Sequence, residues 1–316
     1  MIARALRWLM LLQVLAALGL SWVLWRAGVR PAALALLLGV LGVLLLRALI
    51  VARNFWQSRR FAGEPAPQRL GWTAAARLFA GELGANLRTS SWGMLHPRLC
   101  TAGAPGKDML PVLLIHGYVC NRGFWTPMSC QLARAGVAHG AVDLEPVGAG
   151  IDDFVPAVEQ AIAALLARAG AGKVVIVAHS MGGLVARAYL RRHGTARVAR
   201  VITIGTPHHG TALARLAPGS NARQMSRPGG QPNAWLAQLA ADETAQARAL
   251  ITSIYSYHDN IVAPQDSARL PGARNSAYAG LGHVALASDT RVLRQVLLEI
   301  TIVSEVGAAL LAPHGA

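Results

Sequence analysis

Two long apolar runs dominate the first sixty residues. Residues 8–25, WLMLLQVLAALGLSWVLW, carry no charge and begin and end with tryptophan. After a short break at residues 26–31, the sequence AALALLLGVLGVLLL extends to Leu46, and a further apolar stretch follows Arg47. A helix rises 1.5 Å per residue, so about 18 residues nearly cross a ~30 Å hydrocarbon core. The pattern predicts a transmembrane helical hairpin over residues 1–52.

Arginines around these runs predict how the hairpin is oriented. Arg26 and Arg30 lie in the break between the runs. The arginines outside the runs are Arg4, Arg7, Arg47, Arg53, Arg59 and Arg60. The positive-inside rule then places both ends of the hairpin in the cytoplasm, with the rest of the chain held at a bacterial inner membrane. A signal peptide is the alternative, but no small-x-small cleavage site follows before the second run.

Residues 53–107 are expected to join the hairpin to the rest of the chain. They include Pro65 and Pro67, and between Leu70 and Trp92 apolar positions recur at helical spacing. This spacing predicts an amphipathic helix that lies either on the bilayer or on the following domain. The sequence of this region indicates no function.

Strands and helices alternate after Gly106, so residues 108–316 are expected to form one domain. Expected strands cover residues 111–115, 138–144, 173–178, 198–204 and 251–257, and expected helices cover 154–169 and 182–193. Such alternation predicts a mostly parallel sheet with helices on both faces, with reactive groups just beyond the carboxyl ends of the strands. Residues 206–250 interrupt the rhythm and are expected to form a lid. Its apolar residues Leu213, Leu216, Met225, Trp235 and Leu236 would suit acyl chains.

Composition and charge narrow the choice of partners. Hydrophobic residues make up 53% of the chain and charged residues 14%, which favours membrane contact. A net charge of +15 would suit either nucleic acid or an anionic bilayer. Arginine is scattered without a basic run, and no zinc-ligand spacing or RNA-binding signature occurs, so nucleic acid is not an expected partner. Cys100, Cys120 and Cys130 form no CxxC pair, so reduced thiols are expected.

The strongest chemical signal is the sequence VVIVAHSMGG at residues 174–183. Ser180 follows a buried strand pattern and opens a helix, a sharp turn that requires small residues two positions away on each side. Ala178 and Gly182 supply them, giving AxSxG rather than GxSxG. A serine that only caps a helix would fit these five positions alone, but the strand before Ser180 favours a nucleophile.

A serine hydroxyl needs a base and an orienting acid, expected downstream in the order serine, acid, histidine. Asp259 directly follows a predicted strand, and His283 lies in a glycine-flanked loop before a helix. The intervals of 79 residues (259 − 180) and 24 residues (283 − 259) leave room for the intervening elements. Asp242 and Asp266 are rival acids, but neither directly follows a strand.

Two backbone N–H groups are expected to stabilise the oxyanion. One is the amide of Met181, and the other is the amide of Tyr118, which follows the tight turn at Gly117. His116 is interpreted as a structural residue of this loop. The histidines His179, His208 and His209 are likewise interpreted as packed or loop residues, so no metal site and no cofactor are predicted.

From about residue 110 to 293 the chain resembles bacterial lipases of the α/β-hydrolase superfamily. The resemblance rests on five ordered motifs: LLIHGY, VVIVAHSMGG, ITIGTPHHGT, HDNIVAP and GLGHVAL. It implies Ser180, Asp259 and His283 as the catalytic triad, Tyr118 and Met181 as oxyanion donors, and hydrolysis of acyl-lipid esters. Ala178 departs from the more usual glycine, and the hairpin is not part of a lipase domain. Some related lipases hold structural calcium, for which this chain offers no assignable residues.

The expected function is therefore a carboxylic ester hydrolase that works through an acyl-enzyme at the membrane. Acyl transfer or thioester hydrolysis by the same triad is the alternative among enzymes. A catalytically silent membrane interaction module is the alternative outside enzymes.

Overall fold

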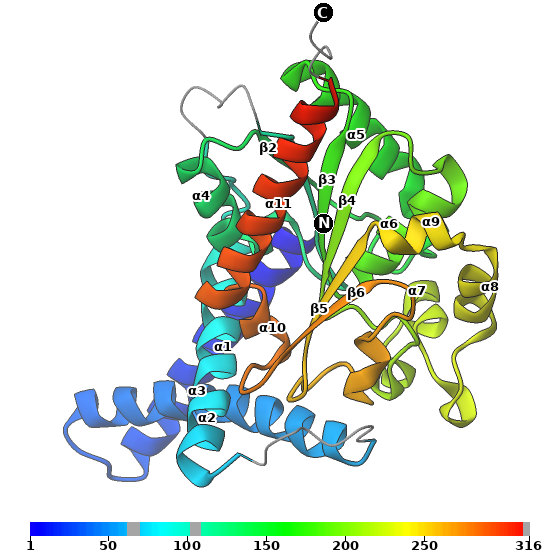
Figure 1. The fold of residues 1–316 in the computed structure, drawn as a ribbon. Coiled ribbons are helices and arrows are strands. Elements are labelled where there is room, and N and C mark those ends of the chain that lie inside the picture. Colours follow the sequence, from blue (N-terminus) through cyan, green and yellow to red (C-terminus); the bar gives the residue numbers. More distant parts are fainter. Residues whose placement is uncertain (62–69, 102–108, 312–316) are drawn as a thin grey trace, which may run out of the picture.

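The computed structural model describes residues 1–61, 70–101 and 109–311 (Figure 1). Its centre is a six-stranded sheet in the order β2-β1-β3-β4-β5-β6, and every neighbouring pair is parallel. The strands are β1 (Val112–Ile115), β2 (His139–Val142), β3 (Val174–His179), β4 (Val198–Ile204), β5 (Ile251–Ser256) and β6 (Arg274–Tyr278). The expected parallel sheet is confirmed, and β6 is a strand whose bounds the sequence pattern did not predict.

Helices cover both faces of the sheet, as expected (Figure 1). Side chains alternate along a strand, so Leu113 and Ile115 pack on one face while Val112 and Leu114 pack on the other. The first face is covered by α5 (Val155–Ala169) and α6 (Met181–His193), and the second by α4 (Thr126–Arg134) and α11 (Thr290–Leu311). Two apolar layers therefore hold the sheet rigid, and its carboxyl edge is left to the loops.

The segment expected to be a lid is largely helical and partly built into the core. It contains η4 (Ala212–Leu216), α7 (Ser220–Gln224), η5 (Pro228–Gly230), α8 (Ala234–Asp242) and α9 (Ala245–Ala249). Met225 and Leu236 are buried in the same apolar layer as α6, and the Trp235 indole N–H donates to Asp152 at 2.7 Å. Leu213 is half-buried, and Leu216 is 59% exposed. Three of the five apolar residues assigned to a lid thus pack against the domain, and of the five only Leu216 is exposed.

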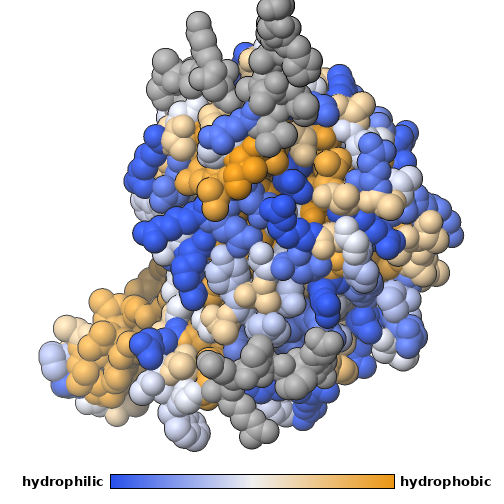
Figure 2. Space-filling model, in the orientation of Figure 1, coloured by the Kyte–Doolittle hydropathy of each residue, from blue (hydrophilic) through white to orange (hydrophobic). Residues whose placement is uncertain are grey.

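The N-terminal hairpin consists of α1 (Ile2–Arg26) and α2 (Ala32–Arg59), both long and apolar enough to cross a membrane. The helices touch closely at Gly39, where an added Cβ would lie 2.0 Å from the Ser21 hydroxyl oxygen. Ser21 donates its hydroxyl to the carbonyl of Ala17 at 2.6 Å, so this polar group is satisfied within α1. Figure 2 shows apolar side chains gathered on the part of the hairpin that projects from the sheet domain.

The amphipathic helix expected between residues 70 and 92 is α3 (Trp72–Arg88). It packs on α10 (His283–Leu286) of the sheet domain, and Phe79 meets Phe55 of α2 with ring centroids 6.4 Å apart. The structure thus shows α3 in contact with the domain, which is one of the two expected positions. Pro65, Pro67 and the expected boundary at residues 107/108 lie outside the described residues.

The expectation of three reduced cysteines is wrong for one pair. Cys100 and Cys130 form a disulfide, with their Cα atoms 4.9 Å apart, and Cys120 is free. The chain before β1 runs beside α4, where the amide of Cys100 donates to the Ser129 hydroxyl at 2.8 Å. Spacing along the sequence could not reveal this pair, because 30 residues and a strand separate its members.

Candidate active site

Ser180 lies at a strained turn between β3 and α6. Its φ of 53° and ψ of −126° fall in a region that residues with a side chain rarely adopt. The neighbouring strand holds this conformation, because the Ser180 amide donates to the carbonyl of Ile204 at 2.9 Å. The Ser180 carbonyl accepts from the Thr206 hydroxyl at 2.9 Å. These two hydrogen bonds therefore hold Ser180 in a backbone conformation that is unfavourable by itself.

Close backbone contact explains why the turn reads AxSxG. A Cβ at Gly182 would lie 2.4 Å from the carbonyl oxygen of Ile115, and no side chain fits there. At Gly183 it would lie 2.1 Å from the Thr206 hydroxyl oxygen. The Ala178 methyl group, by contrast, is already accommodated in the core layer that α5 and α6 cover. The departure from GxSxG thus falls at the position where the fold has room for it.

His283 and Asp259 are paired, as the sequence predicts. Asp259 follows β5 and His283 opens α10, and His283 Nδ1 lies 2.7 Å from Asp259 Oδ2. The other carboxylate oxygen, Oδ1, accepts the amides of Ile261 and Val262 at 2.8 Å each. The carboxylate is therefore held by its own loop in the position that orients the imidazole.

Neither rival acid contacts His283. Asp242, at the end of α8, lies 3.6 Å from the guanidinium of Arg191, and Asp266 lies in η6 (Gln265–Ala268). The only carboxylate that pairs with the His283 ring in the described part of the chain is Asp259.

Opposing effects set the pKa of His283. Burial by itself lowers this pKa, but the carboxylates of Asp259 and, more weakly, Glu82 outweigh burial and raise the pKa above its usual value. The adjacent His179 behaves in the opposite way. Burial, with the repulsion of His283, holds the pKa of His179 well below its usual range, so this ring is neutral.

His179 is packed beside Ser180, as expected, and it also contacts His283. Its ring lies 4.6 Å from that of His283 and 4.4 Å from that of Phe124, measured between centroids. His179 Nε2 lies 3.1 Å from the backbone carbonyl of His283, which can only accept, so this nitrogen carries the proton. The residue before the serine therefore bonds to the backbone of the histidine.

The three predicted triad residues gather around Gly205 at the carboxyl edge of the sheet. A Cβ at Gly205 would lie 3.3 Å from both Asp259 Oδ2 and His283 Nδ1, and the preceding Ile204 binds the Ser180 amide. No hydrogen bond joins the Ser180 hydroxyl to the imidazole among the residues that the structure describes. Catalytic hydrogen bonds are commonly loose in unliganded enzymes and tighten on binding.

The predicted oxyanion loop lies directly against the serine. A Cβ at Gly117 would lie 2.9 Å from Ser180 Cβ. His116 has the structural role expected of it: its Nδ1 lies 2.9 Å from the Gly117 carbonyl, and its Nε2 accepts the amide of Leu144 at 3.1 Å. The Tyr118 hydroxyl donates to the Pro218 carbonyl at 2.6 Å, which ties this loop to the inserted segment.

Elsewhere, the histidines read as loop residues make ordinary hydrogen bonds. His208 Nε2 lies 3.1 Å from the Thr203 hydroxyl, and His209 Nε2 lies 3.1 Å from the Arg269 carbonyl. Within residues 1–61, 70–101 and 109–311, no group of three metal-binding side chains occurs.

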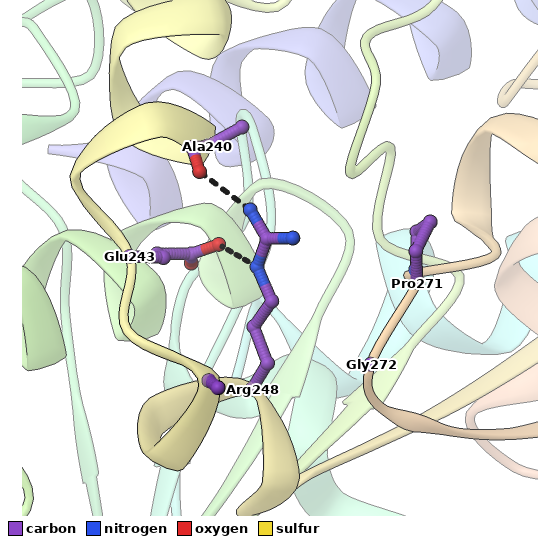
Figure 3. Close-up of a pocket in the computed structure, with 6 residues that line it drawn as sticks. Ala240, Glu243, Arg248, Pro271 and Gly272 are labelled. Carbon is purple, nitrogen blue, oxygen red and sulfur yellow. Dashed lines mark hydrogen bonds and ion pairs between the residues drawn. The ribbon is translucent and has the colours of Figure 1, made fainter.

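A hollow of about 420 Å³ lies away from these residues (Figure 3). Its lining residues are Ala240, Glu243, Ala245, Arg248, Pro271 and Gly272. They lie in the segments that lead into β5 and β6, near the amino ends of strands whose carboxyl ends lead to Asp259 and His283. Arg248 donates to the Ala240 carbonyl and to Glu243 there. The hollow is therefore separate from the candidate active site.

Comparison with known proteins identifies the fold. Residues 111–250 match the family model described as alpha/beta hydrolase fold. The chain contains a domain with the α/β-hydrolase fold. The mature lipase BlEst2 of Bacillus licheniformis superimposes on this domain with a TM-score of 0.55 at 19% identity, covering 64% of this chain and 96% of that one.

Two curated relatives of the hydrolase domain are triacylglycerol lipases. The protein of Burkholderia plantarii is 29% identical over 169 residues, which are 49% of this chain and 44% of the relative. The protein of Pseudarthrobacter phenanthrenivorans is 33% identical over 117 residues, 33% of this chain and 35% of the relative. The chain thus spans less than half the length of the curated relatives it matches.

Sequence reasoning missed two residues that hold the histidine of the hydrolase domain. The Asn260 side-chain oxygen accepts the backbone amide of His283 at 2.9 Å. The Glu82 carboxylate accepts the next two amides, those of Val284 and Ala285. Asn260 directly follows the predicted acid. For Glu82 the sequence offered one signal: it is the only acidic residue between positions 70 and 92.

Proposed function

We propose that this chain is a serine hydrolase of carboxylic esters, with Ser180 as nucleophile, His283 as general base and Asp259 as orienting acid. The observation that carries the proposal is the strained Ser180 at the same sheet edge as the 2.7 Å His283–Asp259 pair. A positive φ at a non-glycine residue is costly, and such strain concentrates at functional sites.

In the proposed reaction, the Ser180 hydroxyl attacks the ester carbonyl while His283 takes its proton. The same imidazolium then protonates the departing alcohol, and a water molecule activated by His283 releases the acid from the acyl-enzyme. The amides of Tyr118 and Met181 would stabilise the oxyanion. Neither amide has an acceptor in the described part of the chain, which leaves both available to a substrate.

We propose lipid acyl esters as the substrate class. Both curated relatives are called triacylglycerol lipases. Leu213 and the exposed Leu216 precede Pro218, whose carbonyl binds Tyr118 beside the proposed oxyanion site. These apolar side chains and the apolar hairpin favour a substrate that is itself delivered from a lipid phase.

The test is hydrolysis of p-nitrophenyl esters of graded acyl length by the full chain in detergent. We expect ester cleavage that extends to long acyl chains, together with covalent labelling by a fluorophosphonate. Adding an alcohol acceptor distinguishes hydrolysis from acyl transfer by its product. A folded protein that neither cleaves any ester of the series nor reacts with the fluorophosphonate would overturn the proposal.

We further propose that the hairpin anchors the enzyme in a bacterial inner membrane. The arginines outside the apolar runs support a cytoplasmic hydrolase domain. The Cys100–Cys130 disulfide supports the oxidising side of the membrane, because cytosolic thiols are kept reduced.

Alkylation of denatured, unreduced protein separates these two placements. A cytoplasmic domain is expected to expose three alkylatable thiols, and a domain on the oxidising side only one, that of Cys120. A reporter enzyme fused to the C-terminus shows independently on which side of the membrane the domain lies. Three thiols with a reporter active outside the cytoplasm would contradict the assignment of the disulfide.

A further inference from the structure

One carboxylate near the candidate site comes from outside the hydrolase domain. Glu82 lies on α3, between the hairpin and the hydrolase domain, and the residue is 0% exposed. Its Oε2 accepts the amide of Ala285 at 2.9 Å, and both of its oxygens lie 3.1 Å from the amide nitrogen of Val284. The side chain therefore connects α3 to Val284 and Ala285, which follow Glu82 by 202 and 203 residues in the sequence.

The amides that Glu82 binds belong to the first turn of the helix that begins with His283. The first amides of a helix have no partner within the helix, so a carboxylate there satisfies them and fixes the turn. Gly282 provides the space, because a Cβ at this position would lie only 2.5 Å from Glu82 Oε2. Together with Asn260 on the His283 amide, Glu82 completes a set of acceptors for three consecutive N–H groups.

Burying a carboxylate is unfavourable, and this one has no cationic side-chain partner among the described residues. Burial raises the pKa of Glu82, and the two backbone hydrogen bonds counteract that rise only in part. A neutral side chain could fill the same space between two helices at lower cost. The charge is thus better explained by what it does to its neighbours than by packing.

We propose that Glu82 is a positioning residue for His283: its carboxylate fixes the backbone of the histidine and supports the imidazolium that forms during the reaction. The inference rests on the proposed function of His283. It adds that a helix outside the hydrolase domain contributes to the active site.

The charged and titratable groups that face His283 come from three elements. Asp259 follows β5, Glu82 lies on α3, and His179 ends β3. Asp259 and Glu82 both raise the pKa of His283, while burial lowers it. A general base works in its neutral form, so the reaction is expected to slow as the pH falls through the pKa of His283. Removing the Glu82 charge should move that slowing to lower pH.

The test compares Glu82→Gln and Glu82→Ala with the exposed-glutamate control Glu305→Gln, all in the full chain in detergent. The first readout is the rate of fluorophosphonate labelling as a function of pH. We expect Glu82→Gln to keep most of the rate at neutral pH and to shift its acidic limb to lower pH. Glu82→Ala frees both amides and is expected to slow labelling by about 10- to 100-fold, as small misplacements of catalytic groups do. The control should match the wild type.

The second readout is the NMR titration of the His283 imidazole, assigned by its loss in His283→Ala. We expect its midpoint to move to lower pH in Glu82→Gln, whether or not the protein cleaves esters. If the wild-type protein does not react with the fluorophosphonate but the midpoint still moves in Glu82→Gln, the ester-hydrolase proposal is overturned and the positioning role stands. A midpoint and a labelling profile that are both unchanged in Glu82→Gln would overturn the positioning role. Should Glu82→Ala fail to fold, Glu82→Gln decides alone.

Discussion

Ser180→Ala is expected to abolish ester cleavage and fluorophosphonate labelling while leaving the fold intact. Loss of a serine nucleophile in a triad typically lowers kcat by a factor on the order of 10⁵ to 10⁶. Alanine keeps the Cβ that packs against Gly117, so the melting temperature should stay close to that of the wild type. Activity and circular dichroism measured on the same preparations check both statements.

Matched substitutions make this result specific. Ser226→Ala removes a hydroxyl whose only hydrogen bond to a described residue is to the Arg223 carbonyl, and it should leave labelling unchanged. Asp259→Asn is expected to lower kcat by roughly 10⁴, because an amide favours the wrong tautomer of the histidine. Asp242→Asn, at the rival acid that faces Arg191, should retain activity. Persistent ester cleavage by purified Ser180→Ala would assign the nucleophile elsewhere.

The second large effect concerns stability and the buried pair Arg187–Glu243. The two side chains are 0% and 2% exposed, and the guanidinium meets the carboxylate through two contacts of 2.6 and 2.8 Å. Removing one partner of such a pair leaves a buried charge and typically costs about 3–5 kcal/mol. Glu243→Ala should therefore lower the free energy of unfolding by that amount, measured by urea denaturation in detergent.

Two further variants separate the buried charge from the loss of side-chain volume. Arg187→Met combined with Glu243→Leu removes both charges and should recover much of the lost stability, since apolar replacements of buried pairs are often tolerated. Arg197→Gln, which removes an exposed cation from its surface contact with Glu159, should change stability far less. A Glu243→Ala protein as stable as the wild type would mean that water reaches Arg187 at little cost.

The expected parallel sheet followed from local patterns that report directly on burial, whereas the α/β-hydrolase fold was implied by the resemblance of five motifs to bacterial lipases. The runs that became β3 and β4 are nearly continuous apolar segments, as parallel strands covered on both faces must be. The strand β6 escaped prediction because its sequence, RNSAY, is polar and largely exposed at the edge of the sheet. The other edge strand, β2, is partly buried and was predicted, so exposure rather than the edge position hides β6 in the sequence.

The candidate site was predictable where its residues lie in short motifs and unpredictable where it depends on distant contacts. Asp259 was found by its place after a strand and His283 by its glycine-flanked loop before a helix, and the structure pairs them. Glu82 reaches the site from about two hundred residues earlier, and nothing in a helical pattern reveals which distant amide a carboxylate will bind. The Cys100–Cys130 pair has the same origin, because tertiary proximity alone brings the sulfurs together.

The close contact at Gly39 has a consequence for how the N-terminus behaves in solution and in a bilayer. The two helices meet closely at Gly39 and Ser21, and most of the leucines and tryptophans of the hairpin are exposed. Such a helix pair is expected to insert into a bilayer as one unit, with its apolar side chains facing the lipid. When detergent or lipid is removed, the exposed apolar side chains of the hairpin are expected to cause aggregation, while the sheet domain remains folded.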